Sequence, residues 1–295
     1  MHSPRSLLAA ARVALAAGVS FAAIAGQAVS ATPPPAERAV AESDWRTPDP
    51  QNVLVITTNK GVIYVELAPE LAPVHVERVK QLARQGFYDG LSFFRVIEGF
   101  MDQTGDPQNT GAGGSTLANL GPEFVFRRGS DSPFSLAARI EGAEAGFIHT
   151  MPVVSQALDL GLLTADHRVK AYGAFCKGVV GMARASEPNS ANSQFFLMRG
   201  EHRALDGQYT PFGRVIAGQD VVDAIKTGEP VETPQDRMLS VKLLADLPAA
   251  SRPRVRVVDP ASAWFQARIA RSVAAQPIGF SPCDIDFPNQ VTPAK

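Results

Sequence analysis

Residues 93–106, FFRVIEGFMDQTGD, carry the most informative pattern in the chain. Arg95 is followed at short, fixed steps by Phe100, Met101 and Gln103. An arginine set among aromatic and thioether side chains, with no histidine beside it, is a poor layout for hydrolysis. The pattern instead indicates a shallow apolar pocket with one polar group at its edge.

Two further clusters follow, NSQFFLMRG at 192–200 and LDGQYTPFGRV at 205–215. The three clusters, R-x4-F-M-x-Q, S-Q-F-F and L-D-G-x4-F-G, together resemble the cyclophilin family of peptidyl-prolyl cis-trans isomerases. The resemblance covers residues 52–246, apart from an insertion at about 108–177. It implies a mainly β fold: a closed eight-stranded antiparallel barrel capped by two helices, with an inserted loop region.

The resemblance also assigns roles to individual residues. Arg95 matches the catalytic arginine of the family, and Gln103 matches the glutamine that orients it. The positions implied to bind substrate are Phe100, Met101, Ala183, Arg184, Gln194, Phe196, Leu205 and Tyr209.

Four positions depart from the family pattern. Tyr209 stands where many members have histidine, and Phe94 replaces a peripheral histidine. Thr104 stands where glycine is usual, which implies a shift of the local backbone. Ala204 stands where many eukaryotic members have tryptophan, which implies weak binding of cyclosporin.

The implied reaction needs no cofactor. Rotation about an Xaa-Pro bond meets a barrier of about 18–20 kcal/mol, because the C–N bond has partial double-bond character. The rotation requires no proton transfer and no covalent intermediate. The five histidines show no metal-ligand spacing, and two cysteines alone do not make a zinc site, so we expect no metal.

The N-terminus has the pattern of a secretory signal peptide. Arg5 and Arg12 flank a stretch without acidic residues, the run 13–25 is apolar or small, and Val29-Ser30-Ala31 offers a cleavage site. We therefore expect residues 1–31 to be removed and the protein to be exported, to the periplasm or outside the cell. The alternative is an uncleaved anchor or an N-terminal helix, although the run is short for a membrane span.

Patterning predicts short strands and few helices. Residues 32–51 are rich in proline and charge and predict a linker, with Trp45 either docked or free, so order is expected to begin at Asn52. A hairpin is predicted around Asn59-Lys60-Gly61. Helices are predicted at 73–85 and 218–225, and strands at 91–97, 178–183, 194–198 and 239–245.

We expect both the insertion and the C-terminal extension to be folded. Apolar pieces recur within 108–177, where a turn between short strands is expected at Asp166-His167. The segment either selects partners or stabilises the domain; the sequence leaves both open. The extension, 247–295, predicts a helix at 260–273 that packs on the barrel, because Pro260 follows an N-cap residue, Asp259.

The two cysteines, Cys176 and Cys283, are expected to form a disulfide in an exported protein. Two separate buried thiols are the alternative.

The net charge limits the classes of molecule that we expect this protein to bind. The net charge of −1 argues against a nucleic-acid footprint. The expected partners are proline-containing polypeptides, with no stable membrane insertion after signal removal, and the expected state is a monomer. Two alternative functions remain: a proline-segment-binding module or chaperone with little turnover, and a scaffolding protein of the cell envelope.

Overall fold

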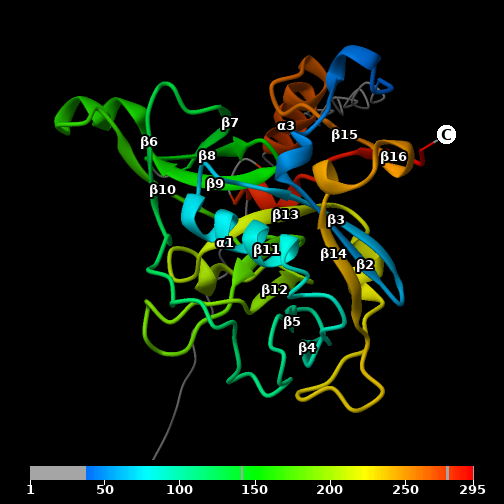
Figure 1. Cartoon of the computed structure of the whole chain (residues 1–295). Coiled ribbons are helices and arrows are strands. Elements are labelled where there is room, and N and C mark those ends of the chain that lie inside the picture. Colours follow the sequence, from blue (N-terminus) through cyan, green and yellow to red (C-terminus); the bar gives the residue numbers. More distant parts are fainter. Residues whose placement is uncertain (1–37, 141, 277–278, 295) are drawn as a thin grey trace, which may run out of the picture. The chain divides into compact units, whose positions relative to one another are not determined.

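A computed structural model describes residues 38–140, 142–276 and 279–294 (Figure 1). The predicted signal peptide, 1–31, and the first part of the linker, 32–37, lie outside the described residues. Within the described residues, no helix is long and apolar enough to cross a membrane.

The largest sheet is antiparallel throughout and has eight strands in the order β14-β2-β3-β13-β11-β12-β5-β4. It forms a curled half-barrel around the main core. Residues beside its two edge strands are joined by a bridge between Ser92 and Arg237. The strands are β2 (Val53–Thr58), β3 (Gly61–Leu67), β4 (Arg95–Ile97), β5 (Met101–Thr104), β11 (Val179–Met182), β12 (Phe195–Met198), β13 (Pro211–Ala217) and β14 (Met238–Leu243).

Two helices accompany this sheet, as predicted. Helix α1 (Pro73–Arg84) begins with proline and buries Val76, Val79 and Leu82 at helical spacing. Its first N–H groups are satisfied from far along the chain, because the carboxylate of Glu123 accepts hydrogen bonds from the backbone of residues 74 and 75. Helix α2 (Gln219–Asp223) is short and lies against β3.

The insertion folds into a second sheet of five strands, in the order β6-β10-β9-β8-β7. These are β6 (Phe126–Arg128), β7 (Phe134–Ile140), β8 (Ala143–Ile148), β9 (Met151–Gln156) and β10 (Val169–Gly173). Residues 166 and 167 lie in the turn before β10, where a turn was expected; a strand follows this turn, but the 3-10 helix Leu158–Leu163 precedes it in place of the expected strand. Buried residues of β9 and β10 share one apolar cluster with Met101, Phe196 and Met198 on the outer face of the large sheet.

Ordered structure begins earlier than predicted. Residues 45–46, placed in the linker by the sequence, form strand β1 (Trp45–Arg46), which pairs with β15 (Arg254–Val258). Strand β16 (Asn289–Thr292) completes this three-stranded sheet. Trp45 packs against the apolar cluster around Trp264 and is therefore docked.

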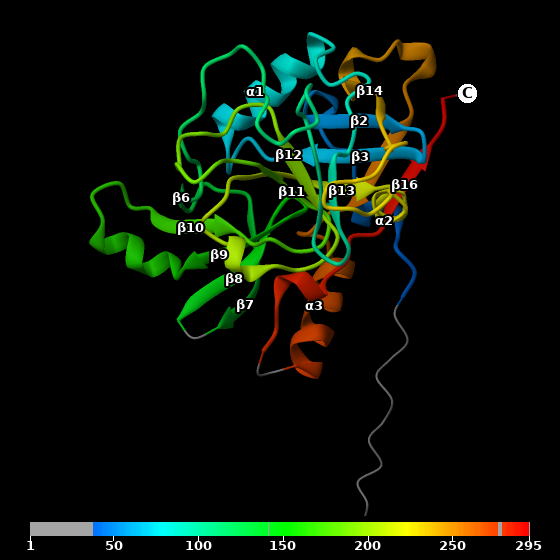
Figure 2. The same ribbon diagram turned by 90° about the horizontal axis from the view of Figure 1, so that it is seen from below.

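The C-terminal helix differs from its prediction in two respects. Helix α3 (Ala263–Ala275) begins after Ser262, whose hydroxyl accepts a hydrogen bond from the backbone N–H of Phe265, so Ser262 is the N-cap. The predicted packing on the barrel is wrong: α3 lies against β7 of the second sheet, as Figure 2 also shows. Phe265 is fully buried there beside Phe147.

Short 3-10 helices connect these elements: Glu42–Asp44, Pro50–Asn52, Leu158–Leu163, Arg203–Leu205, Leu244–Asp246, Ala249–Ser251 and Pro282–Asp284.

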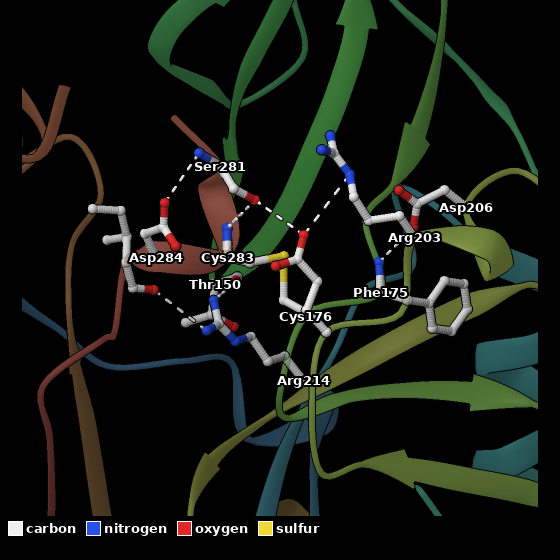
Figure 3. Close-up of a disulfide and its surroundings, with 11 residues drawn as sticks. Thr150, Phe175, Cys176, Arg203, Asp206, Arg214, Ser281, Cys283 and Asp284 are labelled. Carbon is white, nitrogen blue, oxygen red and sulfur yellow. Dashed lines mark hydrogen bonds and ion pairs between the residues drawn. A yellow bond between two sulfur atoms is a disulfide. The ribbon is translucent and has the colours of Figure 1, made fainter. Parts of the chain in front are cut away.

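A disulfide and a buried arginine join the extension to the body of the protein (Figure 3). Cys176 and Cys283 form a disulfide across a sequence separation of 107 residues. Beside it, the guanidinium of Arg214 donates hydrogen bonds to the carbonyl oxygens of Thr150 and Ile285, at 3.0 and 3.4 Å. Burial lowers the pKa of Arg214 to about 10.

Candidate active site

One row of paired residues crosses four neighbouring strands of the large sheet. Arg95 of β4 is paired in register with Gln103 of β5, Gln103 with Phe196 of β12, and Phe196 with Gly181 of β11. Residues opposite each other in an antiparallel ladder point to the same face. Strand pairing alone therefore brings together residues that lie up to 101 positions apart in the chain.

An apolar pocket of about 100 Å³ opens beside this row. Its floor is formed by the nearly fully buried side chains of Met101, Phe196 and Leu205. Gly181 makes room for this floor, since a Cβ atom there would lie 2.7 Å from the Phe196 ring and 2.6 Å from the Phe175 ring. These two rings stack with their centroids 5.8 Å apart. The complete lining is Arg95, Phe100, Met101, Gln103, Ala183, Arg184, Phe196, Leu205 and Tyr209.

The guanidinium of Arg95 lies at the edge of the pocket, between two acceptors. Its Nη1 donates a hydrogen bond to Oε1 of Gln103 at 3.3 Å, and its Nε donates to Oε1 of Glu229 at 2.6 Å. About a third of the arginine side chain is exposed, so a bound molecule can reach it.

A chain of amide groups fixes the orientation of Gln103. Its Nε2 donates to Oε1 of Gln194 at 2.9 Å, which leaves the oxygen of Gln103 facing Arg95. The Nε2 of Gln194 donates in turn to the carbonyl oxygens of Gly111 and Gly113, at 3.0 and 2.7 Å. Gln194 therefore connects the arginine and glutamine pair to the glycine-rich loop.

The glycine-rich loop is held by Asp106, which has no solvent exposure. Its carboxylate accepts hydrogen bonds from the backbone N–H groups of Gln108, Thr110, Gly111 and Gly113. Burial alone would raise the pKa of Asp106, but these four donors hold it below the usual value. Gly111 and Gly113 also line a larger neighbouring cavity of about 630 Å³, which shares Gln103, Ala183 and Arg184 with the pocket.

Arg184 lines both the apolar pocket and the larger cavity. Its guanidinium lies 4.5 Å from the ring centroid of Tyr209 and donates to the backbone carbonyl oxygens of residues 185, 186 and 208. Tyr209 meets Phe196 edge to face, with 6.0 Å between ring centroids. Across the pocket, Phe100 packs at 4.7 Å against the ring of His202.

The acidic residue next to Gln103 serves the other face of the sheet. Asp102 is fully buried, and its Oδ1 accepts a hydrogen bond from Nε of Arg199 at 2.5 Å. Burial raises the pKa of Asp102 to about 7, against the opposing effect of Arg199. Arg199 also donates to the carbonyl oxygens of Val222 and Ile225, so the group ties β5 to α2 and lies outside the pocket.

Comparisons with known proteins agree with this arrangement. The model of the cyclophilin-type peptidyl-prolyl cis-trans isomerase family matches residues 53–243. The chain belongs to the cyclophilin family. A probable peptidyl-prolyl cis-trans isomerase of Brucella suis is 36% identical over 195 residues, which are 62% of this chain and 76% of the relative. Peptidyl-prolyl isomerase cwc-27 of Neurospora crassa is 33% identical over 62% of this chain and 30% of its own length.

A solved cyclophilin matches a larger part of the chain. The crystal structure of AquaCyp293 from Hirschia baltica superimposes with a TM-score of 0.78 at 34% identity, over 88% of this chain and 99% of that one. This share exceeds what residues 53–243 can contain. The similarity between the two cyclophilins therefore extends beyond the family domain into the flanking segments.

As a cyclophilin, the protein is a peptidyl-prolyl isomerase, and the resemblance read from the three sequence clusters is confirmed. Nine of the ten predicted site residues line the apolar pocket, and the tenth, Gln194, lines the neighbouring cavity. Their individual roles stay predictions. Thr104 pairs regularly with Phe195 in this ladder, and its hydroxyl donates to the carbonyl oxygen of Ser92; the backbone shift expected there stays a prediction.

Sequence reasoning missed three residues of this cyclophilin site: Asp106, His202 and Glu229. Asp106 had a local signal, since an aspartate before a run of small residues commonly accepts backbone N–H groups. His202 and Glu229 had none, because the chain topology alone brings them to Phe100 and Arg95. A site with the Arg95 guanidinium at its edge, oriented amides and an apolar pocket can hold a proline ring and stabilise a rotating amide by hydrogen bonding.

Proposed function

We propose that this cyclophilin accelerates Xaa-Pro rotation in exported polypeptides and so assists their folding outside the cytoplasm. The observation that carries the catalytic part is the hydrogen bond between Arg95 and Gln103 at the edge of an apolar pocket. The proline ring would enter the pocket, and free guanidinium donors would hydrogen-bond the substrate and favour the pyramidal proline nitrogen over the conjugated one. An acceleration of about 10⁵ requires about 7 kcal/mol of preferential transition-state binding.

Export is supported by two features. The N-terminal residues 1–31 have signal-peptide composition. The disulfide between Cys176 and Cys283 is of the kind that persists in oxidising compartments. Cell fractionation, with sequencing of the mature N-terminus, tests both the compartment, periplasmic or secreted, and the cleavage after Ala31.

We further infer that the mature protein is a monomer and that its barrel is closed. The support for closure is a pair of backbone hydrogen bonds between the two edges of the half-barrel. The N–H of Phe93 donates to the carbonyl oxygen of Asp236, and the N–H of Met238 donates to that of Leu91, both at 2.9 Å.

The catalytic proposal is tested by cis-to-trans isomerisation of a short Xaa-Pro peptide. Arg95→Ala is expected to lower kcat/KM by about 10²–10³-fold, the usual cost of removing one preorganised transition-state donor. Arg254→Ala is the matched control, because Arg254 is an exposed arginine of β15, outside the pocket. Equal activity of the two variants would contradict the role of Arg95. A folded wild type without acceleration would favour the binding-module alternative.

A further inference from the structure

Arg95 has a second hydrogen-bond acceptor, Glu229, which the family resemblance does not predict. The guanidinium has two acceptors, Oε1 of Gln103 for Nη1 and Oε1 of Glu229 for Nε. The distance to Glu229, 2.6 Å, is shorter than the 3.3 Å to Gln103. Among the described residues, Nη2 of Arg95 has no hydrogen-bond partner, so the two acceptors leave donors of the guanidinium available to a substrate.

The backbone around Glu229 is fixed to the strand that carries Arg95. Gly228 and Val96 exchange two backbone hydrogen bonds, each of 2.8 Å. The N–H of Val231 donates to the carbonyl oxygen of Phe94 at 2.9 Å. The loop is therefore anchored on both sides of Glu229 to the residues that flank Arg95.

The rest of this loop is equally constrained. A Cβ atom on Gly228 would lie 2.7 Å from the Cα atom of Val231, so only glycine fits this compact turn. The Val231 side chain is buried in the main core. At the far end, Asp236 accepts hydrogen bonds from Nδ2 of Asn59 and from the backbone N–H of Lys226, at 2.6 and 2.8 Å. The carboxylate of Glu229 is thus presented from a rigid support.

We propose that Glu229 is a positioning residue that, together with Gln103, sets the orientation of the Arg95 guanidinium before substrate binds. Charge-assisted hydrogen bonds are shorter and stronger than neutral ones, and two acceptors on different nitrogens fix the plane of the group. Misplacing a catalytic group by about 1 Å can cost 10²-fold in rate. Because half of the Glu229 side chain is exposed, its loss should leave the fold intact.

The inference rests on the proposed catalytic role of Arg95, and its test separates the two. Glu229→Ala removes the acceptor, whereas Glu229→Gln keeps an acceptor oxygen at the same reach. The control is Glu232→Ala, which removes the same charge from an exposed position in the same loop. Each variant is assayed for kcat and KM on an Xaa-Pro peptide, for thermal unfolding, and for the Arg95 Nε–H resonance by NMR.

Glu229→Ala is expected to lower kcat about tenfold, since a loosened guanidinium spends less time in the productive orientation. KM and the unfolding temperature should stay at the values of Glu232→Ala. Glu229→Gln should recover most of the turnover. The Arg95 Nε–H resonance should move in Glu229→Ala and stay unchanged in the control.

The proposal is overturned if Glu229→Ala turns over peptide as fast as Glu232→Ala, or if Glu229→Gln is as slow as Glu229→Ala. It is also overturned if the Arg95 Nε–H resonance has the same position in Glu229→Ala as in the wild type. A wild type that does not isomerise the peptide, while Glu229→Ala still moves the Arg95 Nε–H resonance, would instead refute the proposed function and leave the positioning of Arg95 intact.

Discussion

Replacing Cys176 and Cys283 together by alanine removes the covalent link between the body of the domain and the C-terminal extension. In the chain-entropy model, a loop of this length, closed by two cysteines 107 positions apart, restricts the unfolded chain by about 5 kcal/mol at 25 °C. Alanine at position 176 also gives up the packing of a fully buried sulfur, worth about 1 kcal/mol.

The native state should survive the loss of the bond. Ile285 and Phe280 are buried, β16 stays paired with β15, and Arg214 still bonds the carbonyl oxygen of Ile285. The loss therefore appears in the free energy of unfolding, which we expect to fall by about 3–5 kcal/mol once native-state relaxation is allowed for. Isomerase activity well below the melting temperature should be unchanged.

Urea unfolding followed by tryptophan fluorescence and circular dichroism measures this change. Trp264 lies in the extension and Trp45 packs in the same apolar cluster, so tryptophan fluorescence reports on the docking of the extension, and circular dichroism reports on the sheets. Reduced wild type is the control for packing, because it keeps both sulfurs without the bond. A loss below about 1 kcal/mol, with two-state unfolding in both proteins, would refute the loop-entropy reasoning. Release of the extension under limited proteolysis would show that the bond holds the native state.

Two further predictions concern pH and inhibition. The hydrogen bond with Glu70 raises the pKa of His149 above its usual 6.5, and the bond with His149 lowers that of Glu70 below its usual 4.5 although burial opposes it. The contribution of His149 to folding stability is complete below pH 6.5 and is lost as the pH rises through its raised pKa. The contribution of Glu70 is complete above pH 4.5 and is lost as the pH falls through its lowered pKa. Glu70→Gln should therefore cost stability most between these values, by less than about 1 kcal/mol for so exposed a pair, and less at pH 9, where the contribution of His149 is lost; a loss that is constant with pH in urea titrations would contradict this. Cyclosporin should inhibit the wild type weakly, since Ala204 is exposed and small, and Ala204→Trp should bind it about tenfold more tightly; nanomolar inhibition of the wild type would contradict the prediction.

The large sheet and its pocket could be predicted because they depend on local signals. The turn at Asn59-Lys60-Gly61 predicts the β2–β3 hairpin, and Pro73 and Gly86 mark the limits of α1. Four of the site residues, Arg95, Met101, Gln103 and Phe196, lie on strands, whose alternation fixes the direction of each side chain. Once Arg95 and Gln103 are on paired strands, the pocket follows.

The second sheet could not be predicted, because its local preferences point elsewhere. Strand β8, AEAGFI, is rich in residues that favour helices or weaken strands. Pairing with β7 and β9 on both sides decides its conformation. The two residues of β1 carry too little pattern to mark a strand, and Glu229 lies 134 residues from the arginine that it contacts. Only the folded topology supplies these contacts.

The apolar cluster shared by the pocket floor and the second sheet bears on how this cyclophilin could be shortened. Met101 and Phe196 pack with Met151, Val153 and Ala171 as one continuous interior, although no residue of strands β6 to β10 lines the pocket. Deleting those strands to obtain a minimal enzyme would uncover the rear of the pocket floor to water and loosen its rings. The inserted sheet is therefore not a detachable module for protein engineering, and a compact version of this enzyme would need a redesigned polar surface beneath its pocket.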